Sequence, residues 1–543
     1  MTPSDGDHPP WSGVVRTGTG REEPEEMEVE AATAASSSRG EGDHQAGRSL
    51  LDAVVGRTAE ARGAAGGVLE QFLREESPWK ALALWIGQGS RVRGRPTRER
   101  VARLLSRDLA ELDALIARQV NAILHQPDFQ KLEASWRGLR YLVEQAAEGE
   151  NVKIRMLDVT WKELARDAER ALEFDQSQLF RKVYEEEYGH PGGEPFGVLL
   201  GDYEIRHRIG PDHPVDDLAA LAAISTVAAA AFAPFIAGVH PSLLDLVSFA
   251  DLERPMDLSR TFQQQEYLRW RTFRQADDAQ FVGLTLPRVL RRLPYLDDGS
   301  RVDSFRFREE TSSPDRREYL WGNAVYAFGA TLIRAFAATG WFAAIRGVGP
   351  GASGGGVVTG LPVPWFETER PGLATKCSTD VIITDAQEKE LGELGFIPLC
   401  HGQDTSLAIF YGNQSVQKPQ VFQELPATIN ARLTAMLQYT LCVSRFAHYL
   451  KIISRDKLGT FHGPADCEEH LRRWLLNYTV ANEDAAPELK ARHPLREARV
   501  RVRERPERPG HYLCVAHLQP HFQLDQMAMA VRLVTELAPV RAA

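Results

Sequence analysis

Residues 433–448, LTAMLQYTLCVSRFAH, continue into residues 449–459, YLKIISRDKLG, and together they carry a long helical pattern. Apolar side chains recur there at steps of three and four residues, which is typical of a helix with a broad buried face. These apolar positions are Leu433, Met436, Leu437, Leu441, Ala447 and Leu450. We therefore predict one continuous helix over residues 427–450, and this helix opens a distinct C-terminal region.

Three further elements are expected after this helix. A second helix is predicted at residues 467–480, and a final helix at residues 524–537. Between them, residues 498–503 and 512–518 alternate apolar and polar side chains on either side of a turn that contains proline and glycine, which indicates a β-hairpin. The C-terminal region is therefore predicted to be a helix-plus-hairpin module.

The first strand of the predicted hairpin carries the densest basic stretch of the chain. Successive side chains of a strand point to opposite faces, so Arg499, Arg501 and Arg503 share one face and Val500 and Val502 share the other. Two interpretations stay open. The arginines are either a solvated face that discourages accidental strand pairing, or a surface that sets the register against an acidic partner. No aromatic side chains interleave with them, as single-stranded nucleic-acid binding would require.

Upstream, helical and extended patterns alternate. A long helix is predicted at residues 98–123 and another at residues 129–143, where Phe129, Leu132, Trp136, Leu139 and Val143 line one face. Residues 152–159 alternate like a half-buried strand, and residues 196–200 form an apolar run typical of a strand buried on both faces. This mixture predicts an α/β class, a mixed α+β architecture with helices packed on mixed sheets.

Composition excludes several classes of protein. The chain has 543 residues and a net charge of −10, which argues against a general nucleic-acid binder. No apolar run approaches the roughly 18 residues of a membrane span, so no membrane insertion is expected. The five cysteines are few, odd in number and widely spaced, which favours a reducing cytoplasm.

The first 48 residues contain no Leu, Ile, Phe or Tyr and carry ten acidic residues against four arginines. Such a segment buries too little apolar surface to offset its ordering entropy, so residues 1–48 are expected to be a disordered acidic tail. Ser49 then begins a short helical pattern with Leu50, Leu51, Val54 and Val55 on it. This helix either docks on its own subunit or is captured by a groove in a partner.

Two motifs resemble ligand-binding motifs, but the residues around them do not fit such a site. The glycine-rich segment 347–356 lacks the Gly-Lys-Ser/Thr ending of a phosphate-binding loop, and it follows a helical pattern instead of a strand. Cys514, His517 and His521 have a metal-like spacing, but a strand sends the first two to opposite faces. No cofactor-binding or metal residue is predicted.

Two residue pairs hint at catalysis. Cys400 and His401 are sequence neighbours whose side chains diverge on a strand, so they do not form a nucleophile and base. Asp202 and Glu204 share a face near the end of a strand, but no second catalytic group accompanies them. No catalytic residue is predicted.

Six long blocks, in order and spread over about 400 residues, resemble the TssC (VipB) family, the large subunit of the type VI secretion system contractile sheath. They are FQKLEASWRGLRYLV (129–143), FGVLLGDYEI (196–205), FVGLTLPRVLRRLPY (281–295), LWGNAVYAF (320–328), GFIPLCHGQDTSLAIFYGNQSVQKP (395–419) and HLQPHFQLD (517–525). The helix at 433–450 also matches this family.

The resemblance implies a contractile tail-sheath-like fold with four regions. These are the acidic tail 1–48, an N-terminal helical region and linker 49–125, a TssC-like main sheath domain 126–425 and a C-terminal sheath domain 426–543. It also implies a structural protein, not an enzyme, without cofactors. Alternatives are a phage-type contractile tail sheath protein and an unrecognised cytoplasmic enzyme.

The expected partners also follow from the resemblance. They are the small sheath subunit (TssB, or VipA), the inner tube protein Hcp, neighbouring copies of the chain, the baseplate and a ClpV-type AAA+ ATPase. The resemblance implies that the ATPase binds the helix that contains Leu50, Leu51, Val54 and Val55. It also implies strands exchanged between subunits, for which the edges of the hairpin are candidates, with Arg499, Arg501, Arg503, Tyr512, Cys514 and Ala516 as tentative contacts.

Overall fold

The structure is a computed structural model that describes residues 71–87, 97–146, 151–190, 192–299, 305–311, 318–349, 354–363, 377–402, 405, 407–456, 463–482, 485–504, 512–521 and 531–537. The chain divides into two compact units, Met1–Arg103 and Leu104–Ala543. In the first unit the described elements are helical residues 71–74, α3 (Pro78–Gly87) and the first turn of α4 (Arg98–Leu124). The second unit holds the rest of α4 and the described strands.

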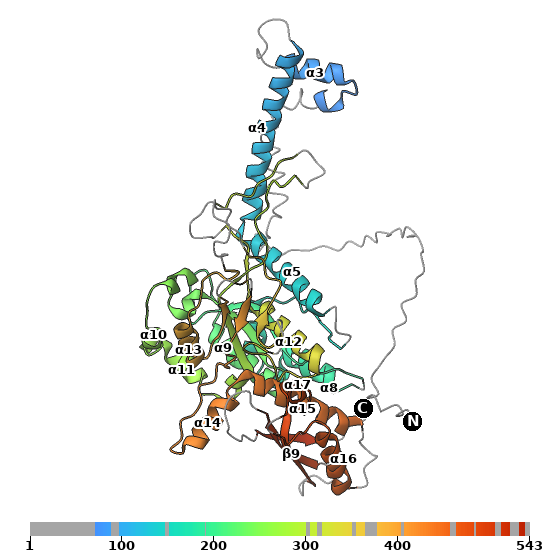
Figure 1. Cartoon of the computed structure of the whole chain (residues 1–543), viewed down its shortest axis with the longest axis vertical. Coiled ribbons are helices and arrows are strands. Elements are labelled where there is room, and N and C mark those ends of the chain that lie inside the picture. Colours follow the sequence, from blue (N-terminus) through green and yellow to red (C-terminus); the bar gives the residue numbers. More distant parts are fainter. Residues whose placement is uncertain are drawn as a thin grey trace, which may run out of the picture. The chain divides into compact units, whose positions relative to one another are not determined.

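Helices make up much of the second unit (Figure 1). The longer ones are α5 (Pro127–Ala146), α6 (Trp161–Arg170), α9 (Asp217–Ala231), α12 (Val325–Thr339), α13 (Asp385–Glu393), α14 (Leu425–Thr434), α15 (Leu437–Asp456) and α16 (Pro464–Leu476). The shorter ones are η2 (Phe174–Gln176), α7 (Gln178–Phe180), η3 (Arg181–Glu185), α8 (Glu186–Tyr188), η4 (Pro241–Leu244), η5 (Phe249–Glu253), α10 (Leu258–Thr261), η6 (Gln265–Tyr267), α11 (Leu268–Phe273), η7 (Asp277–Phe281) and α17 (Pro487–Arg492). Among the described residues, no helix combines the length and the apolar character needed to cross a bilayer.

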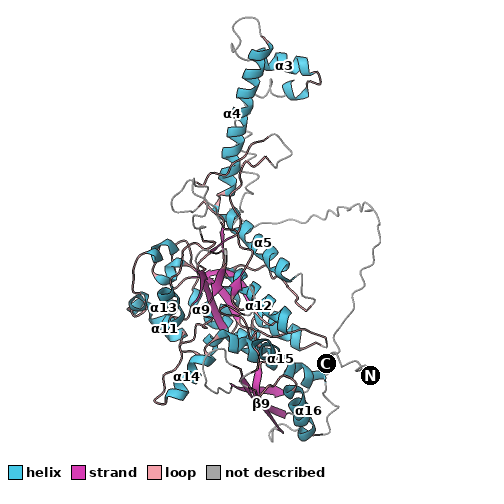
Figure 2. Cartoon of the chain, in the orientation of Figure 1, coloured by secondary structure: helices cyan, strands magenta, loops and turns pink. Residues whose placement is uncertain are grey.

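The central sheet has the strand order β1-β2-β3-β7-β8-β6. Figure 2 colours the strands magenta. Its strands are β1 (Leu199–Ile205), β2 (Phe235–Val239), β3 (Val282–Leu286), β7 (Ile397–His401), β8 (Ala408–Phe410) and β6 (Val357–Val358). The first four pair in parallel, whereas β8 is antiparallel to both of its neighbours. Every residue of β2 and β3 is buried, as expected of parallel strands covered on both faces. A separate two-stranded sheet joins β4 (Val289–Leu290) to β5 (Trp321–Gly322).

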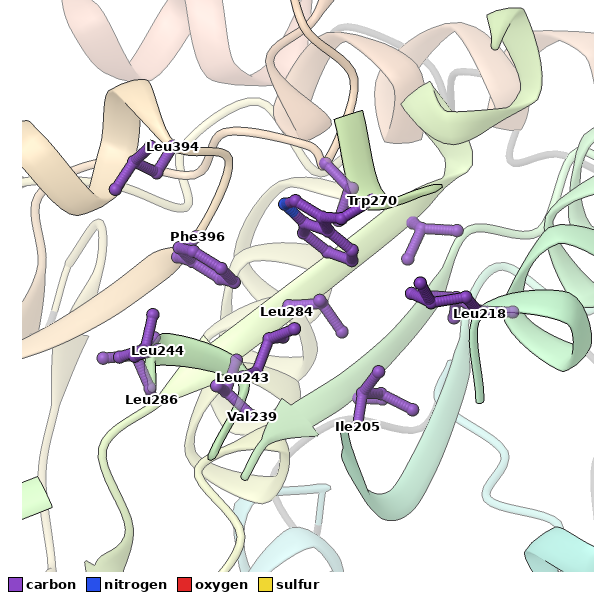
Figure 3. Packing of buried hydrophobic residues seen from close by; sticks show 14 of the residues in the cluster. Ile205, Leu218, Val239, Leu243, Leu244, Trp270, Leu284, Leu286, Leu394 and Phe396 are labelled. Carbon is purple, nitrogen blue, oxygen red and sulfur yellow. The ribbon is translucent and has the colours of Figure 1, made fainter. Parts of the chain in front are cut away.

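Two hydrophobic clusters cover the two faces of the central sheet. On one face Phe235, Ala237 and Val239 of β2 pack with side chains of α9 and α11, and Figure 3 shows part of this cluster. On the other face Ile236 packs with side chains of α12 and α5. Helix α5 approaches α12 closely because Gly138 has no side chain: a Cβ there would lie 2.5 Å from the ring of Tyr326. The body is therefore a helix–sheet–helix sandwich.

The C-terminal region has its own sheet and its own core. Its strands β9 (Leu495–Glu504), β10 (Tyr512–Pro520) and β11 (Val531–Leu537) are antiparallel, in the order β11-β10-β9. Side chains of α15 and α16 pack on β9 and β10 in a third cluster, where Trp341 stacks on Phe446 with ring centroids 4.1 Å apart. This small sheet therefore has one face built into a core.

Several sequence predictions are confirmed. The mixed α/β class is present, and the long helices expected at 98–123 and 129–143 correspond to α4 and α5. The two strands of the expected hairpin are present and paired, with Ala498 opposite Leu518 and Arg503 opposite Leu513. The helix expected at 467–480 corresponds to α16, which ends earlier.

Other predictions are wrong. The helix expected over 427–450 is interrupted between α14 and α15, because Ala435 accepts a hydrogen bond from the amide of Ser415 and Leu437 donates one to Asn413. Residues 531–537 form strand β11 instead of a helix, because the outer edge of β10 is available for pairing. Residues 152–159 alternate in sequence but belong to no strand.

Candidate interaction surfaces

The basic face predicted on β9 is present. Arg499, Arg501 and Arg503 are exposed, whereas Val500 and Val502 between them are each 6% exposed and belong to the core. Arg499 donates to Oε1 of its neighbour Glu497 at 2.6 Å, whereas Arg501 and Arg503 form no ion pair within the described part of the chain. The arginine face is therefore open to a partner.

The second strand of the hairpin is not an edge. β10 lies in the middle of its sheet, so its main-chain groups pair with β9 on one side and β11 on the other. Cys514 and Ala516 are buried in the core, and Tyr512 packs against it. We expected both hairpin strands to be available for pairing between subunits, but among the strands that the structure describes β10 is paired on both sides and β9 is an edge strand. Pairing of another subunit's strand with β9 stays a prediction.

Helix α5 exposes an apolar face that belongs to none of the described cores. The predicted alignment of five apolar residues on one face is present, but Leu132, Trp136 and Val143 are 57%, 57% and 52% exposed. The buried residues of the helix are Ala134, Gly138, Tyr141 and Leu142. Periodicity located this face correctly, but periodicity alone does not reveal whether a face is covered.

Helix α4 also exposes apolar side chains within the second unit. Five of its apolar side chains are at least 40% exposed: Leu109, Leu112, Leu115, Ile116 and Ile123. Many exposed apolar side chains on a folded subunit are typical of an interaction surface. The exposed faces of α4 and α5 together are called the apolar helix face below.

Buried charges fix the junction of α4 and α5 to the body. Arg292, with its side chain 7% exposed, donates to Glu133 of α5 at 2.8 Å and to Glu309 at 2.5 Å, and His125 lies 3.2 Å from Glu309. Burial alone would raise the pKa of Glu133, but Arg292 and Arg137 outweigh it and lower that pKa. The base of the apolar helix face is therefore rigidly held.

A lysine surrounded by aromatic rings joins α15 to the body. The ammonium of Lys451 lies 4.7 Å from the ring centroid of Phe232, 4.9 Å from that of Tyr184 and 5.1 Å from that of Tyr188. Burial lowers the pKa of Lys451 to about 8, while the three ring faces favour its charged form. One turn away, burial lowers the pKa of His448 to about 3, and Nε2 of this neutral imidazole lies 3.1 Å from the carbonyl of Ala231. The contact of Lys451 with these three rings is called the aromatic seam below. No sequence motif indicated it.

The candidate ligand-binding loop uses its amides within the fold. Gly347 donates to the carbonyl of Phe410, Gly356 to that of Gly347, and Gly349 to that of Gly354. These amides are not directed at a phosphate. Cys514 is buried and His517 is exposed, so the two side chains diverge as expected of a strand. Among the described residues, no three His, Cys, Asp or Glu side chains are placed to hold a metal ion.

Of the two candidate catalytic pairs, one is buried in its less reactive form and the other has structural partners. Burial raises the pKa of the Cys400 thiol to about 12 and lowers the pKa of His401, so thiolate and imidazolium are both disfavoured. Glu204 accepts two hydrogen bonds from Arg288, at 2.6 and 2.7 Å. Asp202 accepts hydrogen bonds from Ser135 and Tyr326. Each carboxylate therefore joins neighbouring elements of the sandwich. The helix expected at Leu50, Leu51, Val54 and Val55 lies outside the described residues.

Comparison with known proteins identifies the family of the chain. Residues 106–417 match the VipB family, described as "EvpB/VC_A0108, tail sheath N-terminal domain", and residues 426–537 match its "tail sheath gpW/gp25-like domain". The chain is also 41% identical, over 438 residues, to the type VI secretion system sheath protein TssC1 of Pseudomonas aeruginosa. This alignment covers 80% of the chain and 86% of that relative. The chain therefore belongs to the VipB (TssC) family of type VI secretion sheath proteins.

Proposed function

We propose that the chain is the large structural subunit of a contractile sheath. It polymerises with a small sheath subunit around an inner tube of the Hcp kind, and contraction of the sheath ejects that tube. The observation that carries this proposal is the similarity to TssC1 along most of both chains. The partners, the baseplate among them, follow from the family and not from a contact within this structure.

The surfaces of the subunit support polymerisation. The free edge of β9 and the apolar helix face lie on different elements, so each can engage a different neighbour. A contact between two unlike surfaces, repeated without closing, generates a helical polymer of indefinite length. In this proposal no covalent bond is formed or broken by the chain, and the work of contraction comes from inter-subunit surface buried in the contracted lattice.

The small sheath subunit is proposed to cover the apolar helix face. An amphipathic helix docks by placing apolar anchors in such a face at helical spacing. Trp136 is the natural anchor, because a large aromatic side chain at the centre of an interface dominates its binding energy. A glutamate at position 136 would place a charge in that contact.

The direct test is co-expression of the chain with the small sheath subunit, followed by electron microscopy. The pair should form long tubules, and Trp136→Glu should abolish co-purification and tubules. Lys131→Glu is the matched control, because Lys131 is exposed on α5 and lies five residues before Trp136, on another side of the helix. A pair that forms no tubules under any condition, with both proteins folded, would refute the sheath function.

Recycling by a ClpV-type ATPase is proposed to use the sequence around Leu51 and Val54. Each anchor is worth about 1.5–3 kcal/mol when buried in a groove, so Leu51→Ala with Val54→Ala should weaken capture by about a hundredfold or more. Assembly and a first contraction should be unaffected, and contracted sheaths should persist in fluorescence microscopy. Deleting residues 1–40 should spare recycling. A double variant that cannot assemble would show that these residues serve the subunit's own structure.

A further inference from the structure

One side chain of α16 binds the main chain of β9. The amide of Val502 donates to Oε2 of Glu468 at 2.9 Å, across 34 residues of sequence. Glu468 is partly buried, and α16 packs along β9 on the side that carries Val500 and Val502 (Figure 1). A carboxylate is a stronger acceptor for an amide than a neutral carbonyl. The Glu468–Val502 bond is therefore a firm contact of the subunit.

This bond lies on the free edge of the sheet. β10 pairs with one side of β9 over its whole length. On the other side, within the described part of the chain, the start of β9 pairs with residues 478–480: Leu495 donates to the carbonyl of Tyr478 and accepts from the amide of Val480. From Ala498 to Glu504 no strand of the described residues covers that side. Glu468 therefore accepts the hydrogen bond of an amide with which an added strand would pair.

We propose that Glu468 controls strand addition at β9: its carboxylate occupies the Val502 amide until a strand from another sheath subunit displaces it. This inference rests on the proposed function, which supplies the incoming strand. The exchange replaces an amide–carboxylate hydrogen bond with an amide–carbonyl bond of the growing sheet, and the freed carboxylate returns to water. Unpaired edges invite uncontrolled association. The Glu468–Val502 bond limits such association, because an added strand must form several main-chain hydrogen bonds with β9 to compensate for the one that it displaces.

The side chains of β9 define the strand that fits. Arg501 and Arg503 lie on the face away from α16, and opposite charges on adjacent strands attract. An added strand should therefore place acidic residues on that face. On the other face its neighbours would be the core around Val502 and the carboxylate of Glu468, where a second acidic residue would be repelled. The matching partner is an extended segment in which acidic and apolar residues alternate.

The first test measures hydrogen–deuterium exchange of β9 in the full chain before assembly. Glu468→Ala should accelerate exchange of the Val502 amide at least tenfold. Glu469→Ala is the matched control, because Glu469 is the next residue of α16 and pairs with Arg472 and Arg473 instead of β9. Unchanged exchange in Glu468→Ala would overturn the proposal.

The second test measures binding of a short synthetic peptide of alternating glutamate and valine to the same protein. Glu468→Ala should bind it about tenfold more tightly than the unchanged chain, and Glu468→Gln should fall between, because its amide oxygen still accepts a hydrogen bond. A lysine–valine peptide should bind at least tenfold more weakly. Equal affinity of the unchanged chain and Glu468→Ala, or equal binding of both peptides, would overturn the proposal.

These measurements separate two failures. Tubule formation with the small sheath subunit tests the sheath function, whereas exchange and peptide binding report on the Glu468–Val502 bond in the unassembled chain. Tubules with unaltered exchange in Glu468→Ala would reject control by Glu468 and keep the sheath function. Faster exchange with no tubules from the unchanged chain would reject the sheath function.

Discussion

The two sheets of the second unit differ in how completely the chain covers them. Clusters of side chains close both faces of the central sheet, and β2 and β3 are buried at every residue. On the C-terminal sheet, α15 and α16 cover one face of β9, and its other face carries exposed arginines beside a free edge. The first arrangement is complete within the subunit. The second leaves polar and charged groups for another chain to satisfy.

This contrast separates residues that hold the subunit together from residues that hold subunits to one another. Changes in the central sheet should alter the free energy of unfolding and affect assembly only through it. Changes on the open side of β9 should impair assembly and leave the free energy of unfolding nearly unchanged. The following predictions test that separation, in order of their expected effect on stability.

Truncating a tryptophan in the central core should have the largest effect. Trp270 is fully buried and stacks on Phe396, with ring centroids 6.0 Å apart. Trp270→Ala should therefore lower the free energy of unfolding by about 3–5 kcal/mol, measured by urea denaturation followed by circular dichroism. Trp136→Ala, at an exposed position, should change it by no more than about 0.5 kcal/mol. Similar losses in the two variants would contradict the division between core and interface.

The aromatic seam at Lys451 should contribute a pH dependence of intermediate size. The pKa of Lys451 is about 8 in the folded chain and near 10.5 when unfolded. Between these values the unfolded chain binds more protons, so folding stability should rise with pH from about 8 to 10.5. The gain should be about 1–3 kcal/mol, because the aromatic rings offset part of the desolvation.

Lys451→Met is the control for the aromatic seam, because this variant lacks the ammonium group whose titration is measured. Urea denaturation at pH 7.5 and at pH 10 should show a larger gain at the higher pH for the unchanged chain than for this variant. Parallel pH profiles of the two proteins would mean that the ammonium is not buried against the rings.

Reversing the arginine face should have the smallest effect on folding. Replacing Arg499, Arg501 and Arg503 with glutamate should change the free energy of unfolding by about 1.5 kcal/mol or less, because exposed substitutions are individually worth within about 0.5 kcal/mol. Tubule formation with the small sheath subunit should nevertheless be lost, as electron microscopy would show. Lysine at the three positions should preserve it. Normal tubules from the glutamate variant would mean that these side chains are only solvated.

Local patterns in the sequence were sufficient for much of the fold. Helices α4 and α5 follow from apolar residues at helical spacing, and the hairpin follows from the alternation of arginine and valine around Val500. The final strand β11 was missed because residues 531–537 (VRLVTEL) also suit the end of a helix. Pairing with β10, which no local pattern encodes, decides between the two.

The interaction surfaces were less accessible to prediction. Spacing identified the apolar side of α5, but the exposure of Trp136 depends on which elements pack around it. The Glu468–Val502 bond and the rings around Lys451 join residues distant in sequence, so single-sequence patterns give no signal for them. The interruption before Leu437 involves neither proline nor glycine, and arises from hydrogen bonds to residues 413–415.

Helix α15 contributes to both cores. Leu437 and Leu441 at its start pack in the cluster on the central sheet, whereas Phe446 and Leu450 pack in the C-terminal cluster. A helix of 20 residues is about 30 Å long and stiff along its axis. A force applied to the C-terminal sheet is therefore transmitted through α15 to the central sheet, because neither end of α15 can withdraw without opening a core. In the proposed contractile sheath, each subunit should therefore turn as one rigid lever, and the deformation should fall on the connections between subunits.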